Sequence, residues 1–177
     1  VLHGPSHSEE VAQGLPTTVV AAAPKRKVAE NIQSTFMADN LRVLPSTDVT
    51  GVEIGGAATN VLAIAAGISD GIGYGDNSKA SIITRGFSEI RELGKAMGAS
   101  SKTCNGLAGL GDLVATCVSG HSRNRYVSEQ VGKGKNLEQI REGMSMIAEG
   151  VTKTHAIHGL AERYDMNMPI TERVYTI

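Results

Sequence analysis

Along the first 45 residues, short apolar segments alternate with amphipathic ones, which is typical of an α/β unit. Thr17–Ala22 is rich in β-branched residues and lies between two prolines, so it predicts a buried strand. Leu41–Leu44, closed by Pro45, predicts a second strand. Ser8–Ala12, with glutamates in its first turn, predicts a short helix. A longer helix is predicted over Pro24–Met37 by apolar residues spaced by four: Val28, Ile32 and Phe36.

After Pro45 the pattern changes, because strand-like alternation stops and helical spacing dominates. An apolar stripe from Ile82 to Met97 predicts a helix that ends near Gly98. Asn136–Gln139 resembles a capping box and predicts a helix start. Two further helices are predicted over Ile147–Tyr164 and Ile170–Ile177, the second started by Pro169. The chain is therefore predicted to be mainly α, with a small α/β unit over residues 1–47 and an all-helical domain over residues 48–177.

Composition narrows the function classes. The 177 residues carry a net charge of −1, without a basic block, and include 3% aromatic residues, so neither nucleic acid nor a membrane is expected as a partner. The longest apolar run, Val61–Ile68, is too short to span a bilayer. Cys104 and Cys117 lack metal-type spacing and are expected to be free thiols in a reducing compartment. The start at Val1, in an apolar segment, suggests a piece of a longer protein.

The run Gly109–Cys117, followed by Ser122–Arg125, carries the most chemistry. Asp112 lies among apolar neighbours, where a buried carboxylate needs hydrogen-bond or charge partners. Arg123 can clamp a phosphate or carboxylate because its planar guanidinium donates in pairs. The alternative is that Asp112 and Ser122 each cap a helix and that Arg123 is solvated.

Other polar groups predict less specific chemistry. His155 and His158 are three apart on a predicted helix, but no further ligand completes a metal site, so a surface or packing role is favoured and no metal is expected. Turn formation and helix capping account for the polar residues around the Gly71–Gly73 turn: Asp70, Asp76 and Asn77. His121 adjoins Ser122 and is expected to be exposed.

Several motifs follow one another in a fixed order along the chain: Gly51–Ala57, Asn60–Gly67, Asp70–Asn77, Ile83–Gly86, Gly106–Asp112, Ser122–Arg125, Glu149–Val151 and Met168–Glu172. Together they resemble the bacterial NAD(P)-dependent glycerol-3-phosphate dehydrogenases over essentially the whole chain. Any one of these short motifs alone is weak evidence for the family, whereas the ordered series is specific to it.

The resemblance implies a two-domain enzyme with an N-terminal dinucleotide-binding domain and a helical substrate domain of the 6-phosphogluconate dehydrogenase C-terminal-like type. Residues 1–47 would be the last part of the first, Rossmann domain, and residues 48–177 the second. The glycine fingerprint of dinucleotide binding is absent, so the main cofactor site would lie upstream. The implied activity interconverts sn-glycerol 3-phosphate and dihydroxyacetone phosphate with NAD(P)(H) in glycerophospholipid synthesis. A cytoplasmic homodimer is also implied.

The resemblance carries over to individual residues. The substrate-binding positions it implies are Gly4, Ser6, Asp112, Ser122, Arg123 and Asn124. The cofactor-binding positions it implies are Ser8, Arg123, Ile147 and Glu149. It also assigns catalytic roles to Asp112 and to position 59.

Position 59 departs from the family pattern, which has a lysine where this chain has Thr59. A lysine would polarise the substrate ketone and transfer its proton, whereas a threonine hydroxyl is a far weaker acid. Lys79 is the nearest lysine, but it corresponds to another basic position of the family and is not expected to replace the missing one. Two alternatives follow: an inactive homologue that binds a phosphate ligand or a subunit, and a related β-hydroxyacid dehydrogenase. The latter would leave Ser122–Arg125 without a phosphate to bind.

Overall fold

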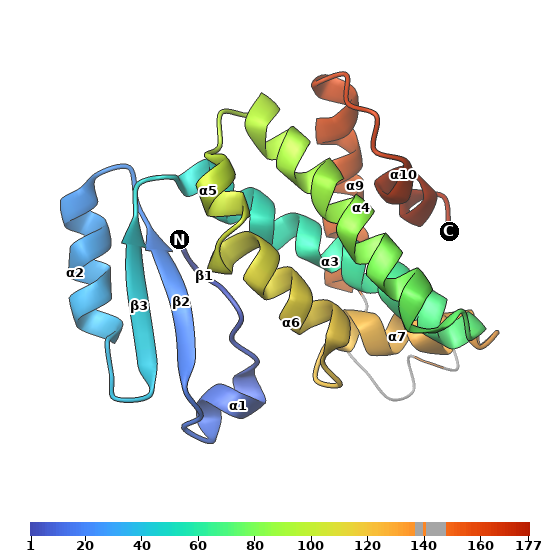
Figure 1. The fold of residues 1–177 in the computed structure, drawn as a ribbon, viewed down its shortest axis with the longest axis horizontal. Coiled ribbons are helices and arrows are strands. Elements are labelled where there is room, and N and C mark those ends of the chain that lie inside the picture. Colours follow the sequence, from blue (N-terminus) through green and yellow to red (C-terminus); the bar gives the residue numbers. More distant parts are fainter. Residues whose placement is uncertain (137–139, 141–147) are drawn as a thin grey trace.

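A computed structural model of residues 1–177 describes the whole chain except residues 137–139 and 141–147. A small sheet with one flanking helix lies beside a larger helical part (Figure 1). The first part contains β1 (Leu2–His3), α1 (Ser8–Ala12), β2 (Thr17–Ala22), α2 (Arg26–Phe36) and β3 (Leu41–Ser46). The second part contains α3 (Val49–Ile72), α4 (Gly75–Ala96), α5 (Ser101–Cys104), the π turn η1 (Leu107–Gly111), α6 (Asp112–Val118), α7 (Arg123–Gly132), α9 (Ala148–Arg163) and α10 (Pro169–Tyr175).

The described residues form a three-stranded sheet in the order β1-β2-β3, which confirms both predicted strands. β1 is antiparallel to β2, and β2 is parallel to β3. β3 continues through Pro45 to Ser46, so the expectation that Pro45 closes the strand is wrong. An edge strand tolerates a proline because the missing N–H leaves the paired side of the ladder intact.

The predicted helix after Pro24 is confirmed as α2, but its apolar stripe is not the buried face. Val28 and Phe36 are 44% and 49% exposed, whereas Ala29 is completely buried. The small Ala29 side chain lets the helix backbone lie close to β2 and β3, with Ile32 partly covered (Figure 1).

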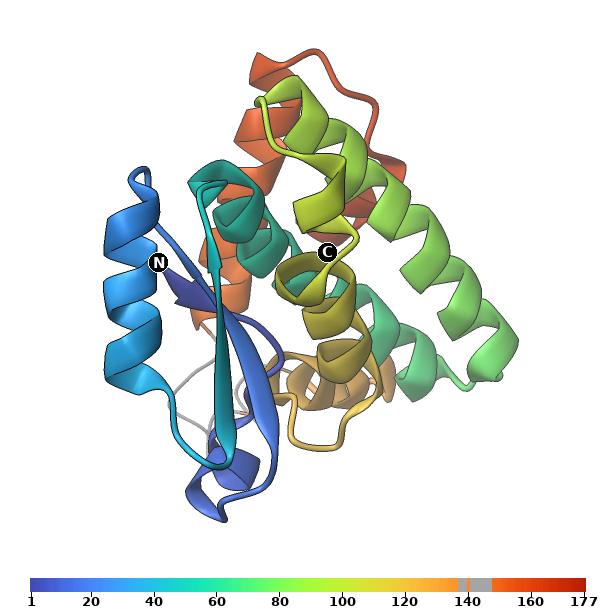
Figure 2. The same cartoon turned by 60° about the vertical axis from the view of Figure 1, so that its left-hand side comes forward.

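α3 is the central helix of the second part, and α4, α6, α7 and α9 pack around it (Figure 2). It is long and apolar enough to resemble a membrane-spanning helix by length and composition alone. In this structure 61% of its apolar window is buried by neighbouring elements, as expected for the core helix of a folded domain.

Glycines allow two neighbouring elements to approach α3 closely. A Cβ added at Gly55 would lie 2.2 Å from the Ala108 carbonyl oxygen in η1. A Cβ added at Gly67 would lie 2.2 Å from the Arg125 carbonyl oxygen in α7. These two contacts set the positions of the elements that carry Asp112 and Arg123.

The ends of the helices agree in part with the sequence. Asp48 caps α3 by accepting from the Gly51 N–H at 2.8 Å, and Gly73 ends the helix at φ 84°. α4 ends at Ala96, close to the predicted end near Gly98. α10 begins at Pro169 as predicted but ends at Tyr175, before the expected Ile177. The predicted capping box falls largely on residues 137–139, outside the described residues.

Candidate functional site

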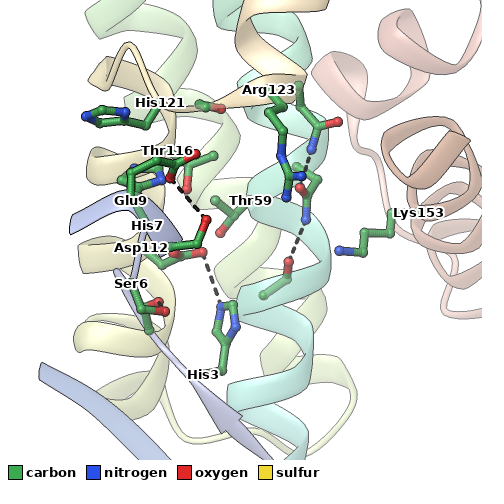
Figure 3. Close-up of a pocket in the computed structure, with 16 residues that line it drawn as sticks. His3, Ser6, His7, Glu9, Thr59, Asp112, Thr116, His121, Arg123 and Lys153 are labelled. Carbon is green, nitrogen blue, oxygen red and sulfur yellow. Dashed lines mark hydrogen bonds and ion pairs between the residues drawn. The ribbon is translucent and has the colours of Figure 1, made fainter. Parts of the chain in front are cut away.

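A cavity of about 330 Å³ lies where the β1–α1 segment meets the helical part. Figure 3 shows its lining side chains, which converge from β1, α1, α3, α6, α7, α9 and the turns between them. The β1–α1 segment contributes His3, Gly4, Ser6, His7, Ser8 and Glu9. The helical part contributes Gly56, Thr59, Asn60, Asp112, Thr116, His121, Ser122, Arg123, Asn124 and Lys153.

Asp112 is 9% exposed and begins α6 directly after the π turn η1. Its carboxylate does not cap the helix, so the capping interpretation is wrong for this residue. Instead, Asp112 Oδ2 lies 3.2 Å from His3 Nε2, which gives the carboxylate the partner that its burial requires (Figure 3). Burial, with a smaller contribution from the Asp112 charge, raises the pKa of the nearby Cys117 thiol to about 12.

Ser122, Arg123 and Asn124 lie at the N-terminus of α7. Ser122 Oγ accepts from the Arg125 N–H at 3.4 Å, which confirms that Ser122 is a helix cap. Asn124 Nδ2 donates to Asn60 Oδ1, and this contact ties α7 to α3. The Arg123 side chain is exposed and also lines the cavity (Figure 3). A helix N-terminus with a guanidinium beside it favours an anion.

Thr59 reaches the cavity from α3 but is 2% exposed. Its hydroxyl donates to the Gly55 carbonyl oxygen at 2.7 Å, one turn earlier in the helix. Lys79 pairs with Asp70 at 2.8 Å and is not among the residues that line the cavity, which agrees with the expectation that it does not replace the lysine.

The turn after β1 lies at the opposite wall of the cavity. Gly4 has φ +153°, and a Cβ there would lie 3.1 Å from the Val19 Cα. Ser6 Oγ donates to the Gly4 carbonyl oxygen at 2.9 Å, and Ser8 Oγ donates to Glu9 Oε2 at 3.1 Å. Hydrogen bonds from the Glu9 backbone N–H and from Ser8 lower the pKa of the Glu9 carboxyl.

The remaining predicted positions lie outside the described residues or take part in other contacts. Ile147 lies outside the described residues, as does the side chain of Glu149. Asp70 lies in the last turn of α3, where its carbonyl oxygen accepts from the Gly73 N–H at 3.1 Å, and its side chain pairs with Arg125 and Lys79, a role that turn formation did not predict. His158 stacks on Tyr175 with ring centroids 3.9 Å apart and pairs with Glu172, which agrees with a packing role.

Three of the basic lining residues were not predicted from the sequence: His3, His7 and Lys153. His3 directly precedes the Gly4–Ser6 turn, which was the available signal. Lys153 has no comparable signal, because a lysine on a predicted helix is usually solvated. His121 is exposed as expected, but it also lines the cavity.

Comparisons with known proteins agree with one another. Residues 48–177 match the family model described as the C-terminus of NAD-dependent glycerol-3-phosphate dehydrogenase. All 177 residues align at 59% identity with glycerol-3-phosphate dehydrogenase (NAD(P)+) 2 of Salinibacter ruber, covering 52% of that protein. They align at 51% identity with the Listeria innocua enzyme of the same name, again covering 52% of it.

The fold is also similar to that of solved structures. The crystal structure of glycerol-3-phosphate dehydrogenase from Coxiella burnetii superposes with a TM-score of 0.94 at 38% identity, over 99% of this chain and 54% of that one. The Saccharomyces cerevisiae enzyme superposes with a TM-score of 0.83 at 27% identity, over 98% of this chain and 54% of that one. The chain therefore spans about half the length of these relatives.

Proposed function

The chain belongs to the NAD-dependent glycerol-3-phosphate dehydrogenase family, and we propose that the full-length protein interconverts sn-glycerol 3-phosphate and dihydroxyacetone phosphate with NAD(P)(H). The observation that carries this proposal is the convergence of Asp112 and the start of α7 on one polar cavity. Such a cavity can hold a small phosphorylated polyol, because cationic groups and helix N–H groups bind the phosphate while polar side chains bind the hydroxyls.

We propose that the phosphate binds at the α7 end of the cavity. Arg123 supplies the guanidinium, Ser122 and Asn124 supply polar contacts, and Lys153 adds positive charge from α9. The Asn124–Asn60 hydrogen bond holds this end against the core helix, so the phosphate would be held at a fixed distance from the rest of the site.

At the other end of the cavity, Asp112 and the Gly4–Ser6 turn are proposed to contact the hydroxyls of the substrate. The Ser8 hydroxyl and the Arg123 guanidinium are donors suited to the cofactor's polar groups, so the cavity fits the nicotinamide end of NAD(P), with Ile147 and Glu149 as further positions that the family implies. The bound nicotinamide supplies or accepts the hydride.

The same proposal includes the surroundings of the reaction. We expect the protein to act in the cytoplasm as a homodimer and to feed glycerophospholipid synthesis. Light scattering coupled to gel filtration of the full-length protein tests the dimer directly.

Activity is tested in the full-length protein by following reduced-nicotinamide absorbance with dihydroxyacetone phosphate as substrate. Calorimetric titration with glycerol 3-phosphate, with glycerol as the control ligand, tests binding separately. We expect binding that requires the phosphate, together with turnover. Binding without turnover would favour the inactive homologue, and no phosphate-dependent binding would contradict the proposal.

A further inference from the structure

The reaction proposed above transfers a proton as well as a hydride, and the cavity must contain a group that accepts and returns this proton. Oxidation of a secondary alcohol breaks its C–H and O–H bonds, and the O–H proton needs an acceptor. Thr59 is a poor acceptor, because a threonine hydroxyl is not basic and this one already donates to the Gly55 carbonyl oxygen at 2.7 Å.

His3 and Asp112 form the imidazole–carboxylate pair that borders the cavity. The 3.2 Å separation between His3 Nε2 and Asp112 Oδ2 is within hydrogen-bonding range, and the side chains are 29% and 13% exposed. An imidazole can both accept and release a proton near neutral pH, and a carboxylate beside it stabilises the protonated form. The two residues are 109 positions apart, so the fold itself assembles the pair.

The local backbone fixes where the imidazole lies. His3 pairs with Val20 in the sheet, which anchors its backbone beside β2. A Cβ added at Gly56 would lie 2.7 Å from both Cε1 and Nε2 of His3, so the ring packs directly on the α3 backbone. Gly56 and Thr59 are neighbours on one face of α3, and the ring therefore occupies the part of the cavity that Thr59 borders (Figure 3).

We propose, on the premise of the function proposed above, that His3 is the acid–base residue of the reaction and that Asp112 positions it. During oxidation, the neutral imidazole takes the O–H proton of the substrate's secondary alcohol as the C–H hydride leaves to the nicotinamide and the C=O bond forms. During reduction, the imidazolium returns the proton to the ketone oxygen. The Asp112 carboxylate, 3.2 Å from Nε2, holds the ring in place and stabilises the imidazolium.

Lys153, on α9, is another basic side chain that lines the cavity and has to be considered for proton transfer. It projects from α9 into the cavity, whereas the buried carboxylate of Asp112 pairs with His3 (Figure 3). We therefore assign it to ligand charge and not to proton transfer. The charged and titratable side chains that share the cavity with His3 are Asp112 on α6, Arg123 on α7, Lys153 on α9, His7 and Glu9 on the β1–α1 segment, and His121 before α7.

The test compares His3→Gln with His155→Gln in the full-length protein. His155 is an exposed histidine on α9 that does not line this cavity, so its variant controls for losing an imidazole. His3→Gln is expected to lower kcat by about 10²–10⁴-fold, the usual cost of losing an acid–base group, with KM changed only a few-fold. The acidic limb of the wild-type kcat profile for glycerol 3-phosphate oxidation should disappear in this variant. Circular dichroism confirms that each variant is folded.

Three further variants make the assignment sharper. Asp112→Asn should shift the acidic limb and lower kcat, because the imidazolium loses its carboxylate. Thr59→Lys should raise kcat by less than about tenfold in the wild-type background but by at least about 10²-fold in the His3→Gln background, where the ammonium replaces the lost acid. Lys153→Met should raise KM more than it lowers kcat.

The outcomes separate this inference from the proposed function. A wild-type protein that neither binds glycerol 3-phosphate nor turns it over would contradict the proposed function. A wild-type protein that turns over while His3→Gln keeps its kcat and its acidic limb would overturn the role of His3 alone. If Lys153→Met lost kcat while His3→Gln stayed active, the acid–base role would belong to Lys153. A wild-type protein that binds the substrate without turnover would also overturn the role of His3.

Discussion

The two ends of the cavity are built differently. The end where we propose that the phosphate binds, here called the phosphate end, is formed by consecutive residues, Ser122 to Asn124, at the start of one helix. The end where we propose that the proton is transferred, here called the acid–base end, is assembled from His3, Thr59 and Asp112, which belong to a strand, the core helix and the helix after the π turn. One end is thus specified by local sequence and the other by the packing of three elements. Substitutions should therefore affect binding and turnover separately.

The largest loss of affinity is expected for Arg123→Ala. A charge-assisted contact to a phosphate contributes more than an ordinary hydrogen bond, so KM for dihydroxyacetone phosphate should rise about 10²-fold, with a smaller change in kcat. Thermal stability should stay close to that of the wild type, because the side chain is exposed. Steady-state kinetics and a melting curve measure both effects.

Arg91→Ala is the matched control, since Arg91 lies on α4 outside the cavity and pairs with Glu92 on the surface. It should leave KM unchanged. If Arg123→Ala kept the wild-type KM for dihydroxyacetone phosphate, Arg123 would not be the residue that binds the phosphate.

The difference between the two ends also explains what the sequence could predict. The existence of the two strands, the start of α1 at Ser8 and the Ser122 cap depend on neighbours a few residues away, and these predictions were correct. The His3–Asp112 contact joins residues 109 positions apart, and neither residue's neighbours indicate the other. The apolar spacing in α2 predicted the helix but did not indicate its contact with the sheet, because that contact uses the small Ala29 while Val28 and Phe36 are exposed.

A pair of glycine substitutions in α3 should perturb one end at a time. In Gly67→Ala the new methyl group meets the Arg125 carbonyl oxygen and displaces α7, so KM should rise. In Gly55→Ala it meets the Ala108 carbonyl oxygen and displaces the π turn that directly precedes Asp112, so kcat should fall. Overpacking of this kind costs about 1–3 kcal/mol of unfolding free energy in each case.

Kinetics and urea unfolding of both variants measure these effects. Gly159→Ala, at a helical glycine with open space around it, is the control and should leave both ends intact. If both cavity variants altered KM and kcat equally, the two ends would not be separable.

Asp48 should have a smaller, pH-dependent effect on stability. It accepts from the Gly51 N–H and from the Ser100 N–H, each at 2.8 Å, and so joins the start of α3 to the start of α5. Burial alone would raise the pKa of the Asp48 carboxyl, but hydrogen bonds from Thr103, Gly51 and Ser100 outweigh it and lower the pKa. Loss of such a cap costs about 1–2 kcal/mol, so Asp48→Ala should lower the free energy of unfolding by that amount at pH 7.

The direction of the pKa shift sets the pH window. A carboxyl whose pKa is lowered by folding stabilises the protein fully above the usual aspartate pKa of about 3.9, and this contribution is lost as the pH falls through the lowered value. The difference between wild type and Asp48→Ala should therefore narrow as the pH falls from 5 toward 3. Asp39→Ala, at an exposed aspartate that caps none of the described helices, is the control. A difference that stays constant down to pH 3 would show that the charge of Asp48 contributes nothing.

The smallest effect is expected at Cys117, which lies on α6 beside the acid–base end. Burial first, and then the Asp112 charge, raises the pKa of its thiol to about 12, so almost no reactive thiolate is present at neutral pH. Iodoacetamide at pH 7.5 should leave native Cys117 unmodified and kcat unchanged, while urea-unfolded protein should react fully, as mapped by peptide mass spectrometry. Modification of the native protein at a rate close to that of the unfolded chain would mean that α6 opens to solvent. In that case the packing that holds Asp112 against His3 would be looser than that of the phosphate end.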